Sequence, residues 1–144
     1  MTHEDAGKYA KKRSNAKLNE MIAARIKEKV SGNSLSCAEA HSIAEKLNVA
    51  PAEVGSAVDL LEVRITKCQL GLFGHGREKN IPELSGKIDP GMESAIKSAL
   101  VNGRLTCLAA WEISKRFGVS KAMVAAASEA LKIKISACQL GTFG

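Results

Sequence analysis

A seven-residue motif that occurs twice constrains this chain more than any other feature. Residues 68–74 are Cys-Gln-Leu-Gly-Leu-Phe-Gly and residues 138–144 are Cys-Gln-Leu-Gly-Thr-Phe-Gly. An ungapped alignment of residues 22–74 with residues 92–144 has 18 identical positions out of 53. Such an internal repeat predicts two copies of one structural unit. Each copy is short enough to be marginally stable alone, so we expect the copies to pack together or the chain to form a homodimer.

The repeat divides the chain into four segments. Residues 1–17 are rich in lysine and small polar residues without apolar periodicity, and we expect a basic flexible arm there. Repeat 1 covers residues 18–74 and repeat 2 covers residues 89–144. Between them, residues 75–88 form a polar linker that contains glycine and proline.

Apolar spacing predicts three helices and a short strand in each repeat. Apolar residues at every fourth position favour a first helix in each repeat, from residue 18 to about 30 in repeat 1 and from residue 90 to about 100 in repeat 2. Ser36 and Thr106 are suited to cap helices that begin at Cys37 and Cys107. Third helices are expected at about 51–61 and 121–131, and alternating apolar residues predict strands at 63–66 and 133–136. The predicted fold class is therefore mainly α with short β-strands.

The repeated motif is expected to be part of the apolar interior. Val63 and Ile65 share one face of the predicted strand, whereas Leu70 has the opposite parity. A turn near Thr66 and Lys67 is therefore needed if Leu70 is also buried. We interpret the leucine and phenylalanine of the motif as a lid that closes the core of each repeat.

The helix pattern carries a resemblance to a known family. The series Ala40-xx-Ile43-Ala44-xx-Leu47-x-Val49, followed by Ala52-x-Val54, and its counterpart in repeat 2 resemble the second and third helices of winged-helix domains in bacterial and archaeal transcription regulators. This resemblance implies two tandem winged-helix repeats whose third helices enter the major groove of DNA. The chain departs from that pattern because one strand runs into the apolar motif, where a winged helix has two strands around a basic loop.

Charge places the expected DNA contact in repeat 2 and the arm. Residues 22–74 carry six basic and six acidic groups, whereas residues 92–144 carry seven basic and three acidic groups. The third helices lack good base readers: the positions expected to face outward are Glu53, Gly55, Ser56 and Asp59 in repeat 1, and Lys121, Ala125, Ala126, Ser128 and Glu129 in repeat 2. The residues predicted to contact DNA are Arg64, Arg104, Lys115, Arg116, Ser120, Lys121, Lys132 and Lys134, together with Lys11, Lys12 and Arg13 of the arm.

The four cysteines allow three interpretations. Cys37 and Cys107 each open a helix, and Cys68 and Cys138 begin the repeated motif. A helix N-terminus favours the thiolate and so a redox role, while a buried cysteine packs as a small apolar group. Metal binding is the third option, although no Cys-x-x-Cys spacing supports it. An alternative function follows: a protein-interaction or thiol- or metal-responsive module that does not read DNA sequence.

Other features limit the remaining function classes. His41 and Trp111 occupy equivalent positions and are candidates for an interface between repeats or subunits. No acid–base pair, nucleophile triad or phosphate loop is visible, so we expect neither an enzyme nor a cofactor. The sequence has no long apolar run and its N-terminus has no apolar signal core, so we expect a cytoplasmic protein that does not bind membranes.

Overall fold

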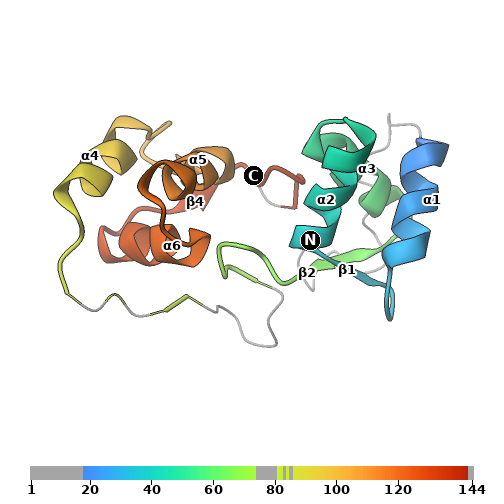
Figure 1. Ribbon diagram of the computed structural model, residues 1–144, viewed down its shortest axis with the longest axis horizontal. Coiled ribbons are helices and arrows are strands. Elements are labelled where there is room, and N and C mark those ends of the chain that lie inside the picture. The colour runs from blue at the N-terminus through green and yellow to red at the C-terminus, as the bar shows by residue number, and fades with distance from the viewer. Residues whose placement is uncertain (1–17, 74–80, 83, 85, 143–144) are drawn as a thin grey trace. The chain divides into compact units, whose positions relative to one another are not determined.

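The computed structural model describes residues 18–73, 81–82, 84 and 86–142, and within these ranges the protein is mainly helical. Six helices and four strands of two or three residues each are present there (Figure 1). None of these helices is long and apolar enough to cross a membrane.

Both halves of the chain have the same order of elements: helix, strand, helix, helix, strand. The first half contains α1 (Glu20–Lys29), β1 (Ser34–Ser36), α2 (Cys37–Leu47), α3 (Pro51–Leu60) and β2 (Arg64–Thr66). The second contains α4 (Pro90–Ser98), β3 (Leu105–Thr106), α5 (Cys107–Phe117), α6 (Lys121–Ala130) and β4 (Ile135–Ser136). The mainly helical class with short strands is confirmed. The strand before the second helix of each half was not predicted from the sequence.

Polar side chains cap the helices where the sequence predicted. The Ser36 Oγ accepts a hydrogen bond of 3.1 Å from the Glu39 amide at the start of α2. The Thr106 Oγ1 accepts the corresponding 3.1 Å bond at the start of α5. Both of these helices end in a left-handed residue, Asn48 and Gly118 respectively, because a tight corner to the next helix requires that conformation.

A small parallel sheet ties the start of the second helix to the end of the third one in each half. Strand β1 pairs with β2, with Leu35 opposite Ile65, and β3 pairs with β4, with Leu105 opposite Ile135. The chain then turns through the left-handed residues Lys67 and Ala137. The turn predicted near Thr66 and Lys67 is thereby confirmed.

The chain forms two compact units that differ from the repeat boundaries. Among the described residues, the first unit consists of residues 18–68 and 139–142, and the second unit consists of residues 69–138. The motif that begins at Cys68 thus continues into the second unit, and the motif that begins at Cys138 continues into the first unit. Leu70 and Leu140 are both 0% exposed. Each motif therefore closes a core, as predicted, but it closes the core of the other repeat.

Helix α3 shows how closely the motif approaches. Gly55 is buried in the middle of this helix, and a Cβ atom at this position would collide with the carbonyl oxygen of Leu140 and lie 2.9 Å from the Leu140 Cα. Real Cβ atoms do not approach that closely. Glycine is thus required at position 55 because the backbone of the motif lies directly on α3.

Candidate nucleic-acid interface

The exposed surface predicted for the third helices is largely absent. Gly55 and Asp59 of α3 are buried, and so are Ala125, Ala126 and Ser128 of α6. The prediction that these positions face outward is wrong. The physical reason is that the motif of one repeat lies on the third helix of the other repeat. The third helix is therefore covered on a second face, in addition to the face that packs on its own core.

In the second unit, the third helix α6 is covered in the same way by the motif that begins at Cys68. A hollow beside Ala125 is lined by Leu72 of the first motif, by Ile81, by Glu129 and by residues 132–135. Ala125 itself is only 2% exposed. Residues on the buried faces of α3 and α6 cannot insert between the groove walls of a DNA duplex while the motif is in place.

Three exposed or half-buried basic residues instead gather at the corner between α5 and α6. Lys115 and Arg116 lie in the last turn of α5, and Lys121 is the first residue of α6. The Lys121 Nζ lies 4.4 Å from the centre of the Trp111 ring, and the Arg116 Cζ lies 5.3 Å from the centre of the Phe117 ring. These aromatic contacts hold the two cations beside the corner. Ser120 caps α6 through a 3.1 Å bond from the Met123 amide.

A second basic group lies at one end of the small sheet. Lys132 and Lys134 are exposed residues between α6 and β4, and Arg104 is the exposed residue before β3. The Leu105 amide donates to the Lys134 carbonyl oxygen at 2.9 Å. Arg104 and Lys134 therefore lie directly before the two paired strands β3 and β4.

The equivalent positions of repeat 1 do not carry this charge. The two basic groups of repeat 2 together contain six lysine or arginine residues. The six equivalent residues of repeat 1 include only two basic side chains, and two others are acidic. The six basic residues are Arg104, Lys115, Arg116, Lys121, Lys132 and Lys134, and their equivalents are Ser34, Glu45, Lys46, Pro51, Glu62 and Arg64. Because the two repeats share the same elements, this charge is a property of the surface and not a requirement of the fold.

The remaining predicted contacts lie elsewhere. Arg64 is exposed on β2, in the first unit. Lys11, Lys12 and Arg13 lie outside the described residues. His41 is half-buried on α2 and Trp111 is half-buried on α5; their role at an interface stays a prediction.

The cysteines are placed at the positions expected from the sequence. Cys37 and Cys107 open α2 and α5 and are each 6% exposed, Cys68 is 7% exposed, and Cys138 is half-buried. None of these four described residues forms a disulfide. Within the described part of the chain, no group of three or more His, Cys, Asp or Glu side chains could hold a metal ion. The low exposure of the first three thiols fits packing as small apolar groups.

One set of site residues was missed at the sequence level. A pocket of about 140 Å³ in the first unit is lined by residues of α1 and α2 that include Arg25, Lys29 and Lys46. A position-by-position comparison of the repeats contains the signal, because the equivalents of Arg25 and Lys29 are Ala95 and Ala99. Two cations where the other copy has alanine indicate a charge that the fold itself does not need.

Comparison with known proteins adds no family. No family model, curated protein or solved structure matches the chain.

Proposed function

We propose that the protein binds nucleic acid through the phosphate backbone, with repeat 2 as the main contact surface. In this proposal each repeat is a winged-helix-like module, and the corner between α5 and α6 and the end of the β3–β4 sheet face the phosphates. The observation that carries it is the set of six exposed or half-exposed cations of repeat 2, whereas repeat 1 has only two basic side chains and two acidic ones at the equivalent positions. Lysine and arginine side chains that replace condensed counterions supply most of such affinity.

The proposal concerns phosphate contacts and not base reading. Base edges are recognised by side chains such as Arg, Asn and Gln that make paired hydrogen bonds. The middle of α6 offers Ala125, Ala126 and Ser128 instead, and these residues are buried. A role in transcriptional regulation would need its sequence preference from residues outside α3 and α6. The basic arm, with Lys11, Lys12 and Arg13, is a candidate for additional phosphate contacts.

A fluorescence anisotropy titration with a mixed-sequence DNA duplex tests the proposal. We expect binding that weakens steeply with salt, and a smaller salt slope when Lys132 or Lys134 is replaced by alanine, by about one for each lost phosphate contact. Lys97→Ala is the matched control, because Lys97 is an exposed residue of α4 that carries the same charge and lies outside both basic groups.

Two results would contradict the proposal. One is an affinity that does not change between low and moderate salt. The other is a Lys97→Ala variant that loses as much affinity as Lys132→Ala, because net charge and not the described surface would then be responsible.

A second candidate function rests on an apolar feature of the same repeat. Leu108 is 53% exposed, and it lines an open hollow of about 570 Å³ together with Trp111, Lys115 and Lys121. An apolar floor with cations at its edge suits a protein segment that carries both apolar and acidic side chains. Leu108→Ser separates the two candidates, because it would weaken docking of such a segment and leave DNA affinity unchanged.

A further inference from the structure

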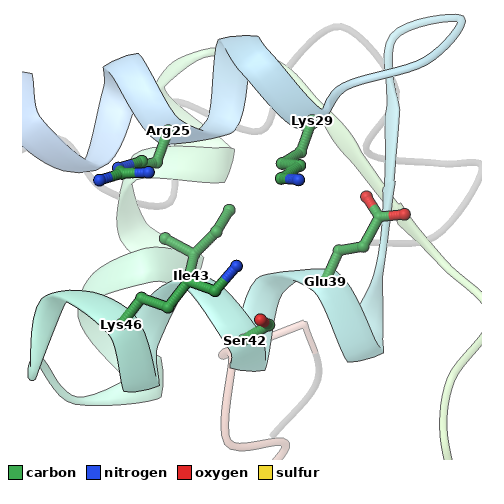
Figure 2. A pocket seen from close by; sticks show the side chains of 6 residues that line it. All are labelled: Arg25, Lys29, Glu39, Ser42, Ile43 and Lys46. Carbon is green, nitrogen blue, oxygen red and sulfur yellow. The ribbon is translucent and has the colours of Figure 1, made fainter.

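The pocket between α1 and α2 brings charged side chains from two helices together. Figure 2 shows that Lys29 from α1 and Lys46 from α2 extend toward the same space beside Ile43. Ile43 is 4% exposed and forms an apolar floor. The pocket measures about 140 Å³, and its lining residues are Arg25, Lys29, Glu39, Ser42, Ile43 and Lys46.

The charges that line the pocket are predominantly positive. Arg25, Lys29 and Lys46 supply three positive charges and Glu39 supplies one negative charge. Arg25 also lies 3.9 Å from Glu28, but these side chains are 51% and 62% exposed. An ion pair between such exposed groups is weak because water screens it. A net positive charge therefore remains around the pocket.

Repeat 2 contains a hollow at the equivalent place with only one of the three cations, Arg116 in place of Lys46. Its lining includes Ala95, Ala99 and Ala109, which are the equivalents of Arg25, Lys29 and Glu39. The isoleucine of the floor is kept as Ile113. Repeat 2 thus shows that the helix packing forms this hollow with alanine at the same sites. Arg25 and Lys29 are therefore not needed to build the hollow, and their presence beside Lys46 needs another explanation.

We propose that the pocket of repeat 1 binds a small oxyanion with more than one negative charge, and that hydrogen phosphate is its preferred form. The lysine ammonium groups and the Ser42 hydroxyl offer several hydrogen-bond donors, and the arginine guanidinium adds a pair of N–H donors in one plane. The volume of about 140 Å³ suits a small ion, since pockets for drug-sized molecules span roughly 300–1,000 Å³.

Glu39 provides a basis for selectivity between oxyanions. A carboxylate accepts hydrogen bonds and repels a fully deprotonated oxygen at its edge. Hydrogen phosphate carries one O–H group that can donate to this carboxylate, whereas sulfate has none at neutral pH. The pocket therefore favours phosphate over sulfate, although both ions carry two negative charges.

Titration of the full-length protein with inorganic phosphate, followed by amide NMR shifts at constant ionic strength, tests the proposal. We expect shifts that concentrate in α1 and α2, and a dissociation constant that rises about three- to tenfold in Lys29→Ala or Lys46→Ala. Lys27→Ala is the matched control: Lys27 is exposed on the same helix, carries the same charge and does not line the pocket. Sulfate should bind more weakly than phosphate, and Glu39→Gln should reduce this difference.

Two results would overturn the proposal. One is an equal loss of phosphate affinity in Lys27→Ala and Lys29→Ala. The other is a set of phosphate-induced amide shifts that lie outside α1 and α2. Sulfate that binds as tightly as phosphate overturns the role of Glu39. The site is independent of the nucleic-acid surface, so Lys132→Ala should leave phosphate affinity unchanged. A gain of phosphate binding in the Ala95→Arg, Ala99→Lys double variant, at the equivalent hollow of repeat 2, would support the assignment of the cations.

Discussion

Replacing Gly55 by alanine should destabilise the protein, although the same change in an ordinary helix stabilises it. Glycine in a helix interior costs about 0.5–1 kcal/mol relative to alanine, so helix propensity alone predicts a gain of that size. In α3, however, the new Cβ would collide with the Leu140 carbonyl oxygen. The motif segment at 139–142 must then move away from α3.

The cost of that displacement follows from the burial of Leu140. This side chain is 0% exposed, and a fully buried leucine contributes about 1.5–3 kcal/mol. Subtraction of the propensity gain leaves a net loss of about 0.5–2.5 kcal/mol in the free energy of unfolding. In a chain that ends at Cys138 the obstructing segment is absent, and Gly55→Ala should instead stabilise the protein by about 0.5–1 kcal/mol.

Urea denaturation followed by far-UV circular dichroism measures both values. Ser56→Ala, at the next residue of α3, is the control and should have the same effect in the full and shortened chains. Fluorescence of Trp111 provides a second signal, because the only tryptophan of the protein lies in the second unit. If Gly55→Ala stabilises the full chain as much as the shortened one, the motif does not lie on α3 and the exchange of motifs is refuted.

Two further predictions concern the cap and the thiols. Ser36→Ala should lower the free energy of unfolding by about 1 kcal/mol, because the Glu39 amide loses its acceptor, and urea denaturation against Ser42→Ala as a control would show it; an equal effect of the two variants would contradict this role. Cys138 should react with a thiol reagent faster than Cys37 in the folded protein, because Cys138 is half-buried and Cys37 is 6% exposed; a mass-spectrometric time course that finds Cys37 modified first would contradict the burial.

Local features of the fold could be predicted because they depend on neighbouring residues. Ser36 and Thr106 mark the starts of helices because their side-chain oxygens accept hydrogen bonds from the amides three residues later. Asn48 and Gly118 mark the corners because they tolerate the left-handed conformation. Leu70 and Leu140 were expected in the interior from the apolar character of the motif, and both are fully buried.

The exchange of motifs could not be predicted, since the two copies are chemically almost the same. Cys-Gln-Leu-Gly begins both segments, so either one supplies the same leucine to either core. Sequence pattern identifies the apolar face of a segment but not its distant partner. The structure resolves this by placing residues 69–73 in the second unit and residues 139–142 in the first unit.

The same limit explains the error on the third helices. Gly55, Ala125 and Ala126 are small and have little apolar character, so a helical pattern places them on the solvent side. Small residues are also what a close approach of another backbone requires. Whether a small residue on these helices faces solvent or another backbone can be decided only when the segment that covers the helix is known.

The candidate sites depend on where the two copies differ. Core positions such as Leu35 and Leu105, or Ile65 and Ile135, are identical and are buried or half-buried in both units. Charge differs at the surface: Glu62 of repeat 1 corresponds to Lys132 of repeat 2, whereas Lys29 of repeat 1 corresponds to Ala99. The same fold thus has cations between α1 and α2 in repeat 1. In repeat 2 it has them at the corner between α5 and α6 and at one end of the β3–β4 sheet. A concave arrangement of cations suits a small anion and an exposed one suits a polyanion, so the two repeats are suited to different ligands.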